Sequence, residues 1–563
     1  MTQIKIQQCQ NCEKEFIVEP EDFEFYEKIK VPVPTFCPEC RMIRRFVWRN
    51  ELSLYKRKND LSEENIISVI SSDKQYKIYD QKHWWSDNWD AMNYGQNYNW
   101  NKSFFEQFRE LLKDVPMIAL VNGNAIRSEY CQHGFNSKDC YLMSAGLDNE
   151  NMMYSNRVWS CADSLDVYIG SNIQLCYETI NCRESYCLFY SRNCRNCQNS
   201  SFLFDCVNCN DCFGCANLRN KSYFIFNKPY SKEEYKKKIQ EFNLGSYKNF
   251  LEIPEKFQEV YKTALHKYAN LRKAVNVIGD NVEEGKNCYF CFDLFGLVED
   301  SKFLWWGGLN CKDSYDGGPG IGDKSELLYE GVDNGIQSSQ TKFSIVVWGC
   351  QNTHYCFNCH SSSNLFGCIG LRHKQYCILN KQYTKEEYEK LVPKIIEHMN
   401  EQPYISRKSQ TPMTNDQSNP KFQISNSKTK EIVYRYGEFF PPELSPFCYN
   451  ETIAQEYFPL TKEQAIEKGY KWKDPEQRNF IPDITTQNLP DNIKDVSDDI
   501  LGKIIQCDHT KFNGNDILES TCNEQCTTAF KIIPQELEFY RKMNLPLPRL
   551  CPNCRHYQRI KQR

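Results

Sequence analysis

One stretch of the sequence occurs twice, and it decides the fold. Residues 194–235 read CRNCQNSSFLFDCVNCNDCFGCANLRNKSYFIFNKPYSKEEY, and residues 347–388 read VWGCQNTHYCFNCHSSSNLFGCIGLRHKQYCILNKQYTKEEY. Both copies contain FGC-x-x-LR-x-K-x-Y followed by N-K-x-Y-[ST]-K-E-E-Y. A duplicated block of this length predicts two copies of one domain.

Short aromatic and β-branched runs continue on both sides of the duplicated block. They recur every 10 to 16 residues or so, and each ends in Asn, Ser, Gly or Asp. We therefore expect a mainly β protein with flanking helices, in which each copy is a cysteine-rich parallel β-helix-like solenoid. A β-sandwich is the alternative. Ser231 with Glu234, and Thr384 with Glu387, predict that each copy closes with a helix.

The chain has 30 cysteines in 563 residues and a net charge of −4. The N-terminus lacks the apolar region of a signal peptide, and no apolar run approaches the length of a membrane span. We expect a cytoplasmic protein without membrane contact, whose cysteines are metal ligands or buried thiols rather than disulfides. The charge excludes a global polycation, so any nucleic-acid contact needs a local basic patch.

Paired cysteines at the two ends predict two zinc ions per chain. Two knuckles separated by a spacer with hydrophobic residues bring four thiolates to one tetrahedral Zn²⁺. The second site has a wider first knuckle, and Cys507 and His509 lie nearby as alternative ligands. The predicted ligands are Cys9, Cys12, Cys37 and Cys40 at one end, and Cys522, Cys526, Cys551 and Cys554 at the other.

Between the knuckles both ends read E-F-Y-x-K-x-x-x-P-x-P-x-x-CPxCR. This motif resembles zinc-ribbon domains of the treble-clef type. The resemblance implies that a helix begins at the second knuckle, near Pro38 and near Pro552. The order of ribbon, aromatic segment, two cysteine-rich repeats and ribbon resembles large uncharacterised bacterial proteins, which implies no function.

Arginines follow each second knuckle at intervals of four, which places them on one helical face. We expect this face either to contact nucleic acid or a protein, or to be a solvated surface. The residues are Arg41, Arg45 and Arg49 at one end and Arg555, Arg559 and Arg563 at the other.

The interior cysteines are predicted to be structural. Cys209 and Cys212 of the first copy become Ser362 and Leu365 in the second. A four-thiolate cluster would not survive this change, whereas a packed core would, because a free cysteine behaves as a small hydrophobic residue.

The predicted division has eight segments. They are a zinc ribbon (1–58), an aromatic helical cap (59–129), solenoid copy 1 (130–250), a linking helix (251–286), solenoid copy 2 (287–404), a flexible linker (405–430), a small α+β connector (431–500) and a second zinc ribbon (501–563).

No constellation of residues identifies a reaction, and no small-molecule cofactor is expected. The sequence favours a zinc-binding, non-enzymatic scaffold that contacts nucleic acid or another protein. The alternative is a glycan-binding or glycan-active β-helix protein, which needs carboxylates converging in one groove. Asp87, Asp90 and Asp316 are the candidates for those carboxylates.

Overall fold

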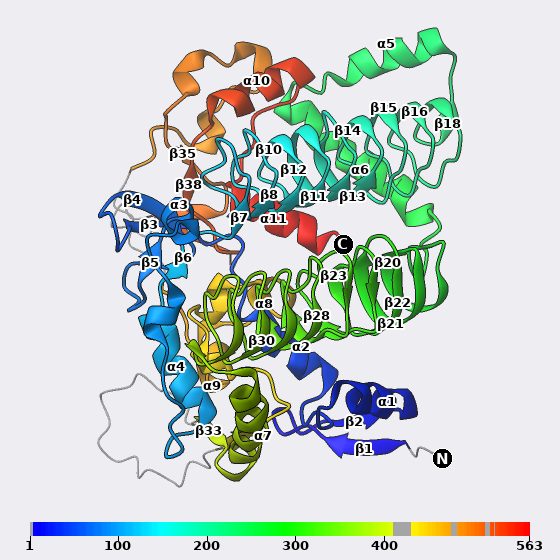
Figure 1. Ribbon diagram of the computed structural model, residues 1–563. Helices are drawn as coiled ribbons and strands as arrows, with labels where there is room; N and C mark the ends of the chain where they lie inside the picture. Colours follow the sequence, from blue (N-terminus) through cyan, green and yellow to red (C-terminus); the bar gives the residue numbers. More distant parts are fainter. Residues whose placement is uncertain (1–3, 409–429, 475–480, 513–517, 523) are drawn as a thin grey trace, which may run out of the picture. The chain divides into compact units, whose positions relative to one another are not determined.

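The computed structural model describes residues 4–408, 430–474, 481–512, 518–522 and 524–563 (Figure 1). The chain forms two compact units. Unit 1 comprises residues 1–119 with 267–473, and unit 2 comprises 120–266 with 474–563. Each unit therefore combines one copy of the duplicated block with the cysteine-knuckle segment from the opposite end of the chain. Residues 409–429 of the predicted linker lie outside the described residues, and the ends of that segment belong to the antiparallel strands β33 (Tyr404–Lys408) and β34 (Lys430–Tyr434).

Unit 2 contains a 12-stranded sheet, whose strands pair in parallel except in the final hairpin of β17 and β18. Ser144 pairs with Asn156, and Gln198 pairs with Asn210, so partners are 12 residues apart. The strands are β7 (Asn122–Gly123), β8 (Gln132–Phe135), β9 (Ser144–Leu147), β10 (Glu150–Met153), β11 (Asn156–Trp159), β12 (Ala162–Ser171), β13 (Tyr177–Arg183), β14 (Tyr186–Phe189), β15 (Gln198–Ser201), β16 (Asn210–Phe213), β17 (Ser222–Ile225) and β18 (Lys228–Pro229).

Unit 1 contains the matching 14-stranded sheet, which also ends in an antiparallel hairpin, β31 with β32. The prediction of a mainly β protein is confirmed. The strands are β19 (Leu271–Arg272), β20 (Val275–Glu283), β21 (Gly285–Leu294), β22 (Val298–Lys302), β23 (Trp305–Gly307), β24 (Cys311–Lys312), β25 (Tyr315–Gly317), β26 (Ser325–Glu326), β27 (Tyr329–Val332), β28 (Ser339–Ile345), β29 (Gln351–His354), β30 (Ser363–Phe366), β31 (Gln375–Ile378) and β32 (Lys381–Gln382).

The backbone of unit 2 has a period of three. From His133 to Phe226 every third residue has a positive φ, between +45° and +64°. Asparagine tolerates this left-handed conformation better than most residues, and it is frequent at these positions. Asparagine side chains also bond to one another at intervals of 12 residues. Asn196 donates to Asn208 at 2.8 Å, and Asn208 donates to Asn220 at 2.9 Å.

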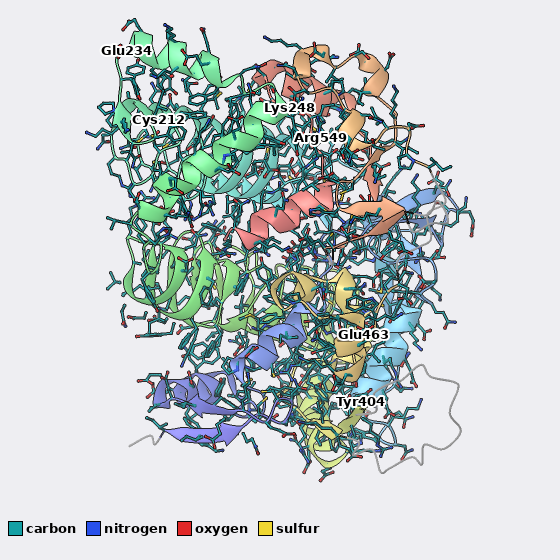
Figure 2. The ribbon with its side chains drawn as sticks, turned by 180° about the vertical axis from the view of Figure 1, so that it is seen from behind. Cys212, Glu234, Lys248, Tyr404, Glu463 and Arg549 are labelled. Carbon is teal, nitrogen blue, oxygen red and sulfur yellow. The ribbon has the colours of Figure 1, made fainter. Side chains whose placement is uncertain are left out.

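From Gly134 to Cys215, the residue after each left-handed position is buried. Cysteine and serine both occur there, and each donates to the backbone carbonyl two residues earlier. The Cys206 Sγ donates to the Phe204 carbonyl at 3.5 Å. The Ser155 Oγ donates to the Met153 carbonyl at 2.9 Å and accepts from the Val167 amide at 3.1 Å. Figure 2 labels Cys212, which occupies another of these buried positions on β16.

Helices cover the strands in both units. The predicted capping boxes at Ser231 and Thr384 are confirmed, and they begin α5 and α7. The helices of unit 2 are α5 (Lys232–Phe242), α6 (Tyr247–Thr263), α10 (Pro534–Met543) and α11 (Pro552–Lys561). Those of unit 1 are α1 (Pro20–Ile29), α2 (Pro38–Phe46), α3 (Gln81–Trp85), α4 (Phe104–Asp114), α7 (Lys385–Glu401), α8 (Ile453–Tyr457) and α9 (Lys462–Glu467).

The aromatic segment packs against the last strands of unit 1. The Arg372 guanidinium lies over the rings of Trp84 and Trp89, at 5.6 and 5.7 Å from their centroids. The Phe104 ring meets Phe366 edge-on, and the Asn380 amide donates to the Ala91 carbonyl at 3.0 Å. These contacts place Trp84 and Trp89 in a protein core, whereas Trp85 and Trp100 are exposed.

Candidate metal centres

The N-terminal centre gathers the four cysteines that the sequence selected. Cys9 and Cys12 lie in the turn between β1 (Lys5–Gln8) and β2 (Glu15–Val18), and Cys37 is the N-cap of α2. The ligand atoms of Cys9, Cys12, Cys37 and Cys40 all lie within 4.8 Å of one another. Helix α2 begins at Pro38, as the resemblance implied, because proline is well suited to a first helical turn.

Neighbouring groups at this centre favour a thiolate at Cys9. Hydrogen bonds from the Cys37 and Cys40 thiols hold the pKa of Cys9 well below its usual value. The Asn11 amide donates to the Cys40 Sγ at 3.2 Å, and the N-terminus of α2 supplies partial positive charge. A metal ion needs deprotonated cysteines, so these contacts suit metal binding.

The C-terminal centre differs from the predicted set in one residue. The structure groups Cys526, Cys551 and Cys554 with Cys507, which replaces Cys522. The Sγ atoms of Cys507 and Cys554 are 3.9 Å apart, and those of Cys526 and Cys551 are 3.8 Å apart. Cys507 arrives there because it follows β35 (Ile505–Gln506), which pairs with β38 (Ala529–Phe530).

Cys522 is also close to Cys554, with their Sγ atoms 3.8 Å apart. It belongs to a second group with His509, Glu524 and Cys554, whose ligand atoms also lie within 4.8 Å of one another. The sequence identified Cys507 and His509 as nearby alternatives, but its spacing gave no sign that Glu524 would join them.

The arginines of α2 are buried in ion pairs within unit 1. The Asp316 carboxylate lies 2.9 Å from Arg41 Nη2 and 3.2 Å from Arg45 Nη1, and the Asp316 side chain is fully buried. Arg49, just beyond the helix, lies 2.6 Å from Glu51. These three guanidinium groups are therefore inside the protein and are not a surface stripe.

Arg44, on the same helix, is held by two carboxylates. Its Nη2 lies 2.7 Å from Glu330 Oε1, and its Nη1 lies 2.7 Å from Glu438 Oε2. Burial raises the pKa of Glu330 to about 6, although the charges of Arg44 and Arg45 act in the opposite direction. The buried charges are compensated in pairs, as the cost of desolvation requires.

Helix α11 repeats this arrangement in unit 2. The Asp166 carboxylate lies 3.0 Å from Arg555 Nε and 2.9 Å from Arg559 Nη2, while Arg559 Nη1 lies 2.9 Å from Glu178. Asp166 and Glu178 have positive φ, as do Asp316 and Glu330 in unit 1. Of the six predicted contact residues, only Arg563 is exposed, and partner binding through these helices stays a prediction.

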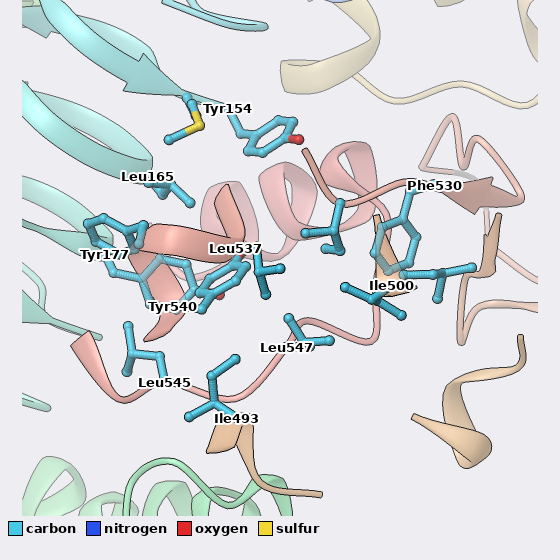
Figure 3. Packing of buried hydrophobic residues seen from close by; sticks show 14 of the residues in the cluster. Tyr154, Leu165, Tyr177, Ile493, Ile500, Phe530, Leu537, Tyr540, Leu545 and Leu547 are labelled. Carbon is cyan, nitrogen blue, oxygen red and sulfur yellow. The ribbon is translucent and has the colours of Figure 1, made fainter. Parts of the chain in front are cut away.

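Apolar packing joins the C-terminal cysteine-knuckle segment to the strands of unit 2 (Figure 3). Tyr540 of α10 meets Tyr177 of β13 edge-on, with ring centroids 5.6 Å apart. Tyr154 donates to Glu536 at 2.9 Å, and Glu536 also accepts from Tyr540. In unit 1, Tyr26 meets Tyr329 in the same edge-on manner at 5.6 Å.

The three carboxylates of the glycan alternative have separate roles. Asp316 is engaged by two arginines. Asp90 accepts from the Met92 amide at 2.9 Å and pairs with Lys374 at 3.2 Å. Asp87 is exposed on the surface. This arrangement gives no support to a groove lined by these acids.

No family model matches the sequence, and no curated protein matches it. The described part of the chain forms no helix that is both long and apolar enough to cross a membrane.

Proposed function

We propose that this chain is a zinc-binding, non-enzymatic scaffold protein with one structural zinc ion in each terminal module. The terminal modules are residues 5–49 and residues 505–563. Cys9, Cys12, Cys37 and Cys40 hold one ion, and Cys507, Cys526, Cys551 and Cys554 hold the other.

The spacing of the sulfur atoms carries this proposal. Four thiolates arranged tetrahedrally around zinc at about 2.3 Å lie about 3.8 Å from one another. The Cys12 and Cys37 Sγ atoms are 3.6 Å apart, and the two pairs at the C-terminal centre are 3.8 and 3.9 Å apart. All four ligands in each set are thiols, which leaves no position for a substrate or a catalytic water and is typical of a structural zinc site.

We further propose that each sheet is the wall of a β-solenoid. In unit 2 the 12-residue offset between parallel partners supports this interpretation, since each coil then contains four three-residue sides. In unit 1 the parallel partners are 11 to 14 residues apart, which fits coils of similar but less regular length. A conventional sandwich is built from antiparallel strands, whereas these pairs are parallel.

In this proposal, zinc holds each module in the shape that positions its arginines. In each module, the helix that begins at the second knuckle carries both the last two ligands and the arginines that pair with buried carboxylates on the strands. Metal binding therefore folds the module and also fixes it to the parallel sheet of its unit, which acts as a rigid scaffold. The scaffold presents its surface to a nucleic acid or to another protein.

Metal analysis of the full chain tests the proposal. Protein expressed with zinc should contain zinc, and Cys37→Ser and Cys526→Ser should each lower the zinc content. Cys187→Ser is the matched control, because this partly buried thiol on β14 belongs to neither group, and it should leave the content unchanged. A zinc-free wild-type protein would contradict the proposal.

The partner class needs a separate measurement. Fluorescence anisotropy with labelled single-stranded RNA and duplex DNA at low salt should detect a contact with phosphates, which salt should weaken. Absence of binding to either probe would exclude nucleic acid and leave a protein partner, to be sought by crosslinking after nuclease treatment.

A further inference from the structure

A second group of potential ligands lies beside the C-terminal centre. It consists of His509, Cys522, Glu524 and Cys554, and their ligand atoms lie within 4.8 Å of one another. Cys554 also belongs to the group of four thiols. Its Sγ is 3.9 Å from that of Cys507, which belongs to the first group, and 3.8 Å from that of Cys522, which belongs to the second. One sulfur atom is thus common to two sets of four ligands.

Two polar atoms of this second group are buried without a hydrogen-bond partner. They are Nδ1 of His509 and Oε2 of Glu524, which lie 3.6 Å apart. Glu524 is only 7% exposed, and its other oxygen pairs with Lys561. A buried carboxylate oxygen without a partner is costly, and a separation of 3.6 Å is too long for a hydrogen bond to the imidazole.

We propose that the C-terminal module binds two zinc ions that share the Cys554 thiolate. The first ion is the one held by four cysteines, so this inference rests on the proposed function. The second ion is bound by His509 Nδ1, Cys522 Sγ, Glu524 Oε2 and the bridging Cys554 Sγ. Imidazole, thiolate and carboxylate are all ordinary zinc ligands.

Electrostatics supports a second cation at this position. Zinc bound by four thiolates carries a formal charge of about −2, because four negative ligands exceed the charge of the ion. The carboxylate of Glu524 and the thiol of Cys522 adjoin this anionic centre, and Lys561 pairs with only one oxygen of Glu524. A second divalent ion offsets the repulsion and satisfies both orphaned atoms.

The N-terminal module provides an internal comparison. Among its described residues, only the group of Cys9, Cys12, Cys37 and Cys40 comes together, with neither a histidine nor a carboxylate. The chain should therefore bind three zinc ions in total, one in the N-terminal module and two in the C-terminal module.

Zinc content of the full chain, measured by mass spectrometry against quantitative amino-acid analysis, tests this inference. Wild-type protein should contain three zinc ions. The His509→Ala/Glu524→Gln variant should contain two, because the four-cysteine site keeps all its ligands. Glu538→Gln is the matched control: this exposed glutamate lies on α10 of the same module, and the variant should keep three.

A second measurement identifies the bridge. After cadmium replaces zinc, the ¹¹³Cd NMR spectrum should show three resonances, two of them scalar-coupled through Cys554 Sγ. The double variant should lose that coupling. Two uncoupled ions in both the wild type and the double variant would overturn the bridged pair but leave the proposed function intact. A wild-type chain without metal would overturn both.

Discussion

Arg559 and Asp166 form a buried ion pair, with Nη2 and Oδ1 2.9 Å apart and neither side chain more than 1% exposed. Arg45 and Asp316 form the equivalent pair in the other unit. In both units, the arginine lies five residues beyond the last knuckle cysteine, and the aspartate that it meets has a positive φ. The same kind of ion pair therefore attaches each terminal module to its strands.

Removal of one partner from this pair should be strongly destabilising. Arg559→Ala leaves Asp166 with one fewer countercharge in a dry environment, so we expect unit 2 to lose about 3–5 kcal/mol of stability. Urea unfolding followed by circular dichroism measures the loss. Arg541→Ala, which breaks an exposed pair with Asp498, should cost less than about 1 kcal/mol. Similar losses in both variants would contradict the importance of burial.

The interior thiols should tolerate serine but not a charge. Cys206 is fully buried after a left-handed residue, and other buried positions of that kind hold serine, such as Ser155 and Ser200, so we expect Cys206→Ser to cost about 1 kcal/mol or less. Cys206→Asp buries a carboxylate in the same core and should prevent unit 2 from folding. Thermal unfolding and zinc content are both measured. Loss of zinc in Cys206→Ser would show that this thiol is a ligand.

Chelation should unfold the terminal modules while the two large sheets stay folded. A strong chelator removes the ions, and each module is too small to keep its fold without them. Hydrogen exchange should show lost protection at residues 9–49 and 505–563, while the amides of β14 and β29 stay protected. Simultaneous loss of protection throughout both units would mean that folding of the two large sheets depends on zinc directly.

Replacement of Lys342 should stabilise unit 1 in a pH-dependent manner. Lys342 lies on β28 and is 7% exposed. Burial lowers its pKa to about 8, and the charge of Lys30 acts in the same direction. In the unfolded chain the pKa is about 10.4, so below pH 8 the folded state bears the cost of a buried ammonium, a penalty of about 3 kcal/mol.

Between pH 8 and about 10.4 the unfolded state binds more protons, so the stability of the wild type rises with pH. Lys342→Met should therefore be more stable than the wild type at pH 7, and this advantage should disappear near pH 10.4. Denaturant titrations at both pH values measure the difference. Lys312→Met, at an exposed position on β24, is the control and should show no such pH dependence. An equal advantage of Lys342→Met at both pH values would contradict the lysine burial argument.

Local patterns in the sequence were informative where the structure depends on local geometry. The Cys9 and Cys12 knuckle and the Cys37 and Cys40 knuckle have characteristic spacings, and the structure gathers these four residues. The helix that starts at Pro38 follows from the fixed φ of proline. The same reasoning selected Cys526, Cys551 and Cys554 but took Cys522 instead of Cys507.

The fourth thiol was missed because its position depends on strand pairing. Cys507 approaches Cys554 only because Ile505 pairs with Phe530, and no short motif encodes that antiparallel pair. The arginines present a similar case. Their spacing placed them on one helical face, but the pattern is the same whether that face meets water or a buried carboxylate.

The sequence by itself indicated a mainly β protein, the cysteine knuckles and the helix starts, because each of these depends on residues close together in the chain. Only the tertiary structure decided which terminal module packs on which large sheet. It also decided that Arg45 and Arg559 are buried and that Cys554 belongs to two ligand groups. Those properties depend on residues far apart in the sequence, such as Arg45 with Asp316 and Arg559 with Asp166, which folding alone brings within bonding distance.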